Sequence, residues 1–124
     1  MKYVAVSGMT VIPVEQGVSI DGWTVTTQPS SNVFADGKGV YSGGISVTVP
    51  QPTLVEGGFV APPTTFTLHP SSLYVKADGK YALLEGDTSD TVTLTGTNPG
   101  SGATSEFSLT LKVSVAGQTC VKAE

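Results

Sequence analysis

One four-residue motif occurs twice in this chain and constrains its fold more than any other feature. Ala35-Asp36-Gly37-Lys38 returns as Ala77-Asp78-Gly79-Lys80, and each copy follows a Pro-Ser-Ser segment and an apolar run. A two-residue type I′ turn needs a positive φ at both central positions, which aspartate tolerates and glycine adopts freely. Because Asp-Gly between β-prone runs is a strong hairpin signal, we predict two related β-hairpins.

The position of the turn determines the pairing that we expect within each hairpin. Residues at equal distances from Asp-Gly face each other, so that one face of each hairpin collects aliphatic side chains. The expected pairs are Ala35–Lys38, Phe34–Gly39 and Val33–Val40 in the first copy, and Ala77–Lys80, Val75–Ala82 and Leu73–Leu84 in the second. The interval between Pro-Ser-Ser and the turn is one residue longer in the second copy, which would invert the side-chain facing unless a β-bulge absorbs it.

The composition favours an all-β protein. Of 124 residues only 13% are charged, and the chain is rich in valine and threonine, with 15 glycines and 8 prolines. Valine and threonine suit pleated, half-buried surfaces. We therefore predict a single domain over residues 1–124, a compact antiparallel β-sandwich or barrel-like fold. Its two repeat units span roughly 20–49 and 64–96, and a Pro/Gly-rich loop over 50–63 joins them.

Two further patterns refine this prediction. Asp21-Gly22 separates two short β-prone runs, 18–20 and 23–27, and indicates another hairpin. Later in the chain, apolar residues alternate with polar ones over a long stretch, which predicts a strand with one dry face and one wet face. The residues of the dry face are Phe107, Leu109, Leu111, Val113 and Val115.

The charge pattern excludes some classes of partner. The formal net charge is −4, and the six lysines are spread along the sequence without a basic cluster. Binding to nucleic acid or to an anionic membrane surface is therefore not expected. The apolar run at the N-terminus is too short for a signal peptide, and no stretch approaches the length of a membrane span. We expect the protein to stay where it is made, or to leave by a route that reads no cleaved signal.

Few residues suggest chemistry. The one histidine, His69, aligns with Gln28 of the other copy, so a polar role at a strand end suffices. The one cysteine, Cys120, cannot form an internal disulfide, and we interpret it as a small apolar residue on a terminal strand. Glu85, Asp87 and Asp90 lack the alternating spacing of a calcium loop. We predict no enzyme activity, no catalytic residue, no cofactor and no metal site.

A binding surface is the remaining kind of site. The segment 50–63 contains four prolines and Gly57-Gly58 around four apolar residues. These apolar residues either cover the core or dock on a partner. Trp23 is large enough to be a core or an interface anchor. The candidate partner-binding residues are therefore Trp23, Leu54, Val55, Phe59 and Val60.

Two segments carry a family resemblance. Residues 30–43 and 73–87 resemble the strand–turn–strand element of PAAR-type spike-tip proteins, with a small residue, an apolar residue, Asp-Gly-Lys and a later glycine. Those proteins cap trimeric spikes of contractile phage tails and type VI secretion systems. The several histidines or cysteines with which they hold zinc are missing here, and Ile20-Asp21-Gly22-Trp23 stands in place of their early His-Gly-Gly element.

The resemblance implies a noncatalytic structural accessory protein of a phage or prophage, associated with the virion or tail. Its partners would be other phage structural proteins or further copies of the chain. Its location would be the host bacterial cytoplasm during assembly and then the virion or tail particle. The alternative is an immunoglobulin-like β-sandwich that binds a ligand or carbohydrate, which the Thr- and Ser-rich strands and the regular turn spacing suit. The aromatic residues for a sugar platform, Trp23 and four tyrosines, are scattered along the chain.

Overall fold

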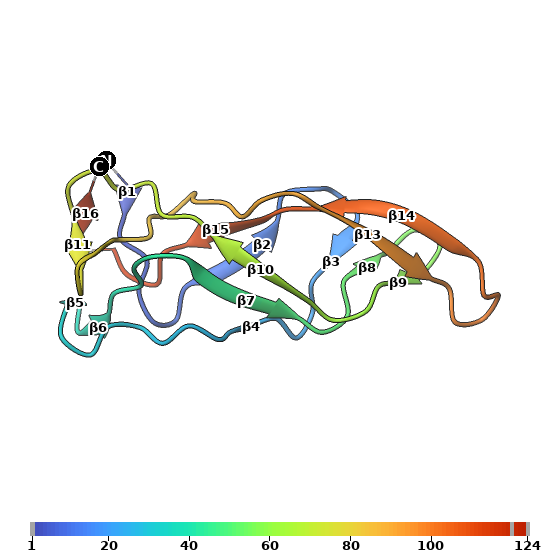
Figure 1. Ribbon diagram of the computed structural model, residues 1–124, viewed down its shortest axis with the longest axis horizontal. Coiled ribbons are helices and arrows are strands. Elements are labelled where there is room, and N and C mark those ends of the chain that lie inside the picture. The colour runs from blue at the N-terminus through green and yellow to red at the C-terminus, as the bar shows by residue number, and fades with distance from the viewer. Residues whose placement is uncertain (1, 120, 124) are drawn as a thin grey trace.

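The computed structural model describes residues 2–119 and 121–123, and this part of the chain is built of antiparallel strands without a helix. The all-β prediction is thereby confirmed. The molecule is elongated, and both chain ends lie at the same end of it (Figure 1). There β1 (Lys2–Tyr3) pairs with β16 (Lys122–Ala123). Over the described residues no helix is present that could cross a membrane.

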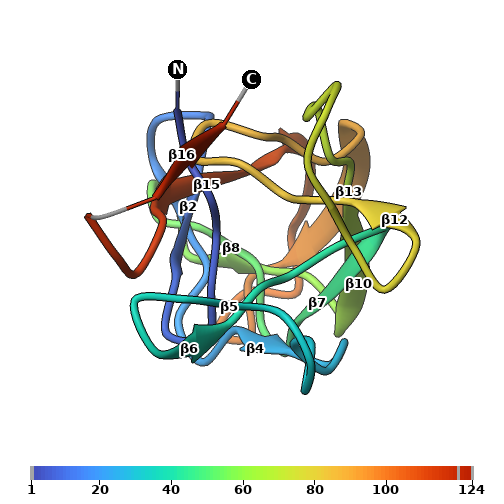
Figure 2. The ribbon, with the colours of Figure 1, turned by 90° about the vertical axis from the view of Figure 1, so that its left-hand side faces the viewer.

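The middle of the molecule is a curled layer of strands. β7 (Ile45–Val49) pairs on one side with β4 (Thr24–Val25) and on the other with β10 (Thr64–Leu68). β2 (Thr10–Pro13) pairs with β15 (Leu111–Val115). Single bridges from Leu68 to Ser89 and from Thr88 to Lys112 connect β10 to β15 through residues 88–89. The order β4-β7-β10-(88–89)-β15-β2 therefore wraps around one core, and Figure 2 shows this curl along the long axis.

A five-stranded sheet forms the other end of the molecule. Its order is β14 (Thr104–Leu109), β13 (Val92–Thr97), β9 (Phe59–Val60), β8 (Thr53–Leu54) and β3 (Val18–Ser19). The predicted loop over 50–63 is thus wrong in part, because it contains the hairpin β8–β9. Positive φ values of 88° at Gly57 and 64° at Gly58 allow the reversal. The prolines lie outside the paired residues, where no ladder donor is missing.

The core follows from the alternation of apolar residues in these strands. Ile45, Val47 and Val49 of β7 are fully buried, and Phe66 and Leu68 of β10 pack with them. The long alternating segment is confirmed through Phe107, Leu109, Leu111 and Val113, all of which are buried.

The prediction for Val115 was wrong, since its side chain is 52% exposed. A register irregularity between Val113 and Val115 changes the facing of β15 at this point. The segment is also divided at Thr110, whose amide donates a 2.7 Å hydrogen bond to a carboxylate oxygen of Glu15. At this residue the chain leaves β13 and begins to pair with β2.

Asp21-Gly22 does not connect a pair of adjacent strands. The amide of Trp23 donates to the carbonyl of Ile20 at 3.2 Å, so the chain does turn here. However, β3 pairs with β8 and β4 pairs with β7. The predicted hairpin is wrong because the two short strands pair with partners in two different sheets.

Candidate functional site: the ribbon end

The two Asp-Gly motifs form the predicted turns. The φ angles are 53° and 74° at Asp36 and Gly37, and 54° and 79° at Asp78 and Gly79. β5 (Phe34–Ala35) pairs with β6 (Lys38–Gly39), and β11 (Lys76–Ala77) pairs with β12 (Lys80–Tyr81), in the expected register. We call residues 30–40 the first ribbon and residues 72–82 the second ribbon.

Neither ribbon contains a bulge. Ser30 and Ser72 each lie six residues before the aspartate of their turn. The hydroxyl oxygen of Ser30 accepts the amide of Val33 at 2.9 Å, and that of Ser72 accepts the amide of Val75 at 3.2 Å. The ribbons are therefore equivalent from these serines onward, and the additional residue of the second copy precedes the serine.

The expected pairing of Leu73 with Leu84 was wrong. Leu84 forms its bridge with Val4 instead, and Leu73 is 67% exposed. The chain bends at residues 73–74, outside the paired strands. The aliphatic face of the second ribbon therefore ends at Val75.

A third ribbon, which the sequence did not predict, is formed by β1 and β16 with the residues beside them. The amide of Val4 donates to the carbonyl of Val121 at 3.0 Å, as Val40 donates to Val33 at 3.0 Å and Ala82 to Val75 at 2.9 Å. The side-chain oxygen of Gln118 accepts the amide of Val121 at 2.8 Å and replaces the serine. We call residues 118–123 with 2–4 the third ribbon; its described residues exclude Cys120, so the prediction for that cysteine lies outside the described residues.

A signal for the third ribbon does exist in the sequence. Val75-Lys76-Ala77 and Lys80-Tyr81 of the second ribbon recur as Val121-Lys122-Ala123 and Lys2-Tyr3. The copy is easily missed because its two halves stand at opposite ends of the sequence and no Asp-Gly connects them.

The three ribbons meet in a closed ring of backbone hydrogen bonds. Tyr41 donates to Ala5 at 3.0 Å, Ala5 donates to Leu83 at 2.8 Å, and Leu83 donates to Tyr41 at 2.9 Å. A second cycle of three bonds joins Ser7 to Gly39, Gly43 to Tyr81 and Glu85 to Tyr3, at 2.8–2.9 Å. Segments 3–7, 39–43 and 81–85 are thus related by an approximate threefold axis. Figure 2 views this end of the molecule and shows the ribbons placed around its centre.

Two apolar clusters hold the ring from opposite sides. The side chains of Ala5, Tyr41 and Leu83 belong to the main core, whereas alternate residues of the same segments belong to a smaller cluster beneath the ribbons. The buried members of that cluster are Val4, Val6, Ala35, Val40, Ala77, Ala82 and Leu84. Burial also raises the pKa of the Tyr41 phenol above its ordinary value of 10.0, because the phenolate is poorly solvated there.

The outer surface of the ribbon end, which we define as the three ribbons and segments 3–7, 39–43 and 81–85, combines lysines with exposed aromatic residues. Lys76 lies over the ring of Tyr81, 4.7 Å from its centroid, and Lys122 lies over Tyr3 at 4.6 Å. These are equivalent positions of the second and third ribbons. The ribbon end also exposes large apolar residues; they are Phe34, Leu73, Tyr74, Tyr81 and Val121. Of the nine large apolar residues that the described surface exposes most, five are therefore on the ribbon end.

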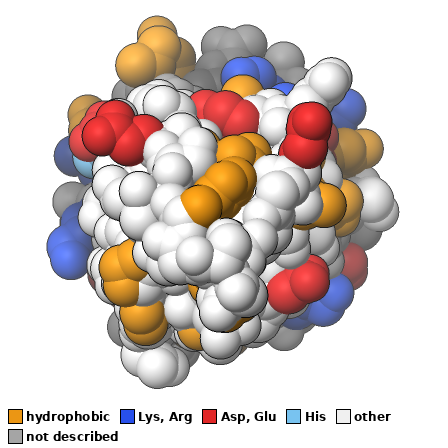
Figure 3. Space-filling model, turned by 90° about the vertical axis from the view of Figure 1, so that its right-hand side faces the viewer, with side chains coloured by type: hydrophobic (Ala, Val, Ile, Leu, Met, Phe, Trp, Pro, Cys, Tyr) orange, Lys and Arg blue, Asp and Glu red, His pale blue; other side chains and the backbone are white. Residues whose placement is uncertain are grey.

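The predicted partner-binding residues lie elsewhere, and most are partly buried. Val55 is 61% exposed, in the turn between β8 and β9, and its amide donates to the carbonyl of Gly17 at 2.8 Å. Trp23 and Leu54 pack against the main core, while Phe59 and Val60 are half-buried in β9. Figure 3 views the end opposite the ribbons, where apolar side chains appear as separate patches and several acidic side chains are also visible.

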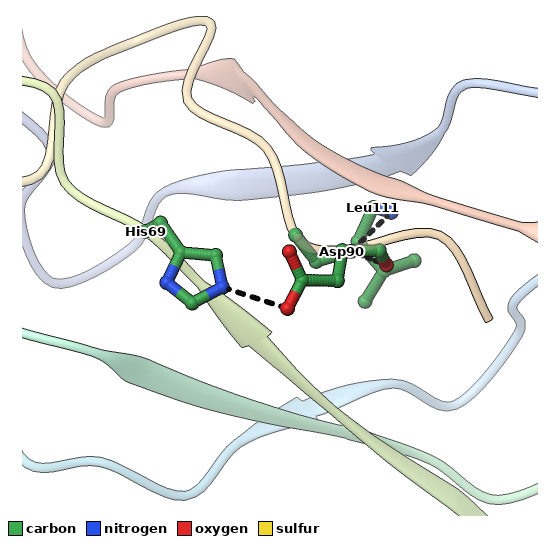
Figure 4. A network of polar contacts seen from close by, with 4 residues as sticks. His69, Asp90 and Leu111 are labelled. Carbon is green, nitrogen blue, oxygen red and sulfur yellow. Dashed lines mark hydrogen bonds and ion pairs between the residues drawn. The ribbon is translucent and has the colours of Figure 1, made fainter.

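His69 forms an exposed pair with Asp90. Its ring Nε2 lies 3.2 Å from a carboxylate oxygen of Asp90, and both side chains are more than half exposed (Figure 4). The neighbouring Ser89 hydroxyl accepts the amide of Leu111 at 2.9 Å and donates to the Asp90 carbonyl at 3.0 Å, so it is engaged with backbone. The pair therefore ties the end of β10 to the segment before β13.

Asp87, the central residue of the acidic group around Gly86, has a structural role. Asp87 is buried, and its carboxylate accepts the amides of Ser71 at 3.0 Å and of Leu84 at 2.8 Å, as well as the hydroxyl of Ser71. Within the described residues no group of three or more potential metal ligands occurs.

Comparison with known proteins adds nothing to this description: no family model, curated protein or solved structure matches the chain.

Proposed function

We propose that this protein is a noncatalytic structural accessory protein of a phage or prophage, which docks its ribbon end onto a protein assembly with threefold symmetry. The observation that carries this proposal is the closed ring of hydrogen bonds from Tyr41 to Ala5 to Leu83 and back. It gives a single chain three nearly equivalent ribbons around one axis. The motif resemblance described above suggests the phage context.

Approximate threefold symmetry has a direct physical use. A trimer presents the same surface patch three times around its axis. A single chain with three equivalent ribbons can make a similar contact with each subunit. The contacts then act together, since the first one holds the other two at high effective concentration. One copy of the chain would bind per trimer, because the contact closes around the axis.

The ribbons supply a suitable contact surface. Exposed aromatic residues such as Phe34, Tyr74 and Tyr81 provide rigid apolar area of the kind that anchors protein interfaces. The small cluster under the ribbons and the ring itself hold the backbones, so little ordering is needed on binding. The candidate residues around Val55, at the opposite end, stay a competing prediction of where the partner binds.

The test uses the full chain and the structural proteins encoded beside its gene. We expect a stable complex with a trimeric partner, in a ratio of one chain to three partner copies by native mass. The double variant Phe34→Glu/Tyr74→Glu, which adds charge to the first two ribbons, should abolish it. The matched variant Val55→Glu, in an equally exposed turn at the other end, should retain it.

Two results would contradict the proposal. One is a complex that forms with a monomeric partner in equal numbers. The other is loss of binding in Val55→Glu while Phe34→Glu/Tyr74→Glu still binds.

A further inference from the structure

The fold collects lysines that the sequence disperses. Five of the six lysines lie in the three ribbons, and only Lys112 lies outside them. All five are exposed: they are Lys2, Lys38, Lys76, Lys80 and Lys122. Outside the three ribbons, the described residues include Lys112 and seven carboxylates, namely Glu15, Asp21, Glu56, Glu85, Asp87, Asp90 and Glu106. Positive charge is therefore concentrated at the ribbon end, although the net charge of the protein is −4.

The lysines also repeat with the symmetry of the ribbons. Lys2, Lys38 and Lys80 occupy the same register position, each opposite an alanine. Lys38 donates to the carbonyl of Gly117 at 2.8 Å, and the stem of Lys80 lies against Gly43, so these two side chains extend from their ribbons onto neighbouring segments. Lys76 and Lys122 are held over tyrosine rings.

Within the described part of the chain, these ammonium groups form no ion pair with a carboxylate. Across residues 2–119 and 121–123, the single ion pair within 4.0 Å is that of His69 with Asp90, which involves no lysine. An ammonium group bonded to a carbonyl or stacked on a ring keeps further N–H donors for a ligand. The ribbon end therefore presents several partly oriented ammonium groups that form no ion pair among the described residues.

We propose that the partner surface bound by the ribbon end is acidic, with carboxylates that meet the lysines of each ribbon. This inference rests on the proposed function and specifies the chemistry of its partner. Charge complementarity of this kind accelerates encounter and sets orientation. Because the opposite end of the molecule lacks lysines, the electrostatic field of the protein would orient the ribbon end toward an acidic surface as the two proteins approach.

The mixture of charges favours a protein partner over a uniform polyanion. Asp36 and Asp78 occupy the tips of two ribbons, two residues from Lys38 and Lys80. The side-chain amide of Asn32 donates to a carboxylate oxygen of Asp78 at 3.3 Å, which links the two ribbons. A continuous array of phosphates would be repelled by these tip carboxylates, whereas discrete side chains of a protein can pair with each charge.

The experiment tests charge and symmetry separately with four helical peptide probes. Two are parallel trimeric coiled coils and two are isolated helices. In each kind, one probe ends in glutamates and the other in lysines. Binding is followed by backbone amide shifts of the full chain. We expect the glutamate-ended trimer to bind best, to shift amides of all three ribbons, and to weaken as salt is added. The double variant Lys76→Glu/Lys122→Glu should bind it at least about fivefold more weakly. Lys112→Glu, a single reversal outside the ribbons, should change binding less than about twofold.

Each other result has a defined meaning. Equal binding of lysine- and glutamate-ended trimers would overturn the charge inference and leave the threefold function intact. Equal binding of the glutamate-ended single helix would support the charge inference and contradict the threefold function. Tighter binding to phosphatidylglycerol vesicles or to duplex DNA than to the glutamate-ended trimer would overturn the inference. So would the absence of binding to all four probes.

Discussion

Equivalence of the three ribbons predicts that the chain tolerates a circular permutation. The perturbation joins residue 124 to residue 1 and opens the chain between Asp78 and Gly79. The joined turn is given the residues of the other two turns by the substitutions Glu124→Asp and Met1→Gly. Two residues would then connect Ala123 to Lys2, as Asp36-Gly37 connects Ala35 to Lys38.

The expected change in stability is small because one turn is closed while an equivalent one is opened. Two cross-strand pairs adjoin each turn, Ala77–Lys80 with Lys76–Tyr81 and Ala123–Lys2 with Lys122–Tyr3. Such pairs contribute about 0.2–1 kcal/mol each. Up to about 2 kcal/mol is thus weakened at the opened ribbon and a similar amount is gained at the closed one. The net change in the free energy of unfolding should stay within about 1 kcal/mol.

A control permutant opens the same joined chain inside β7, between Val47 and Thr48. β7 forms five residue pairs with β10 and two with β4. Seven pairs correspond to roughly 1.4–7 kcal/mol, a large part of the total stability of about 5–15 kcal/mol expected for a domain. This control should be strongly destabilised or unfolded.

The assay is denaturant unfolding combined with amide hydrogen exchange. In the permutant opened at Asp78, the amides of Ala5, Tyr41 and Leu83 should retain the protection of the original chain, since all three donate within the ring. If this permutant is as unstable as the β7 control, or if the ring amides lose protection, the equivalence of the ribbons is refuted.

Three further predictions test the ring and its surroundings. Leu83→Ala, at a fully buried ring position, should lower the free energy of unfolding by about 2–5 kcal/mol, whereas the exposed Leu73→Ala should change it by less than about 0.5 kcal/mol; urea denaturation distinguishes them. Gly39→Ala should cost about 1–3 kcal/mol in the same assay, because the added Cβ would overlap the carbonyl oxygen of Ser30; an unchanged midpoint would contradict this close contact. Burial raises the pKa of Tyr41 above 10.0, so the unfolded chain releases the phenol proton at a lower pH than the folded protein does. The free energy of unfolding should therefore fall as the pH rises from 10 through the folded-state pKa. Tyr41→Phe should remove this loss in unfolding curves measured against pH.

Local geometry explains why part of the ribbon end could be predicted. The positive φ values of Asp36 and Asp78 follow from residues that are adjacent in sequence, and so does the register beside each turn. Local geometry fails to predict the pairing at Leu73, because the chain bends there. Leu84 instead forms a β-bridge with Val4, a residue from a distant segment. Likewise, Asp21-Gly22 carries the same local signal, but its flanking strands pair with separate partners.

The sequence by itself determined the class of the fold, the two Asp-Gly turns and the buried face of the long alternating segment, because each depends on neighbouring residues or on a period of two. Only the tertiary structure decided that a third ribbon exists, that three segments close a ring, and that five lysines gather at one end. These features join residues from the two ends and the middle of the chain, as in the ring of Ala5, Tyr41 and Leu83. Long-range backbone hydrogen bonds of this kind have no local signature, since they depend on where whole strands are placed rather than on which residues adjoin.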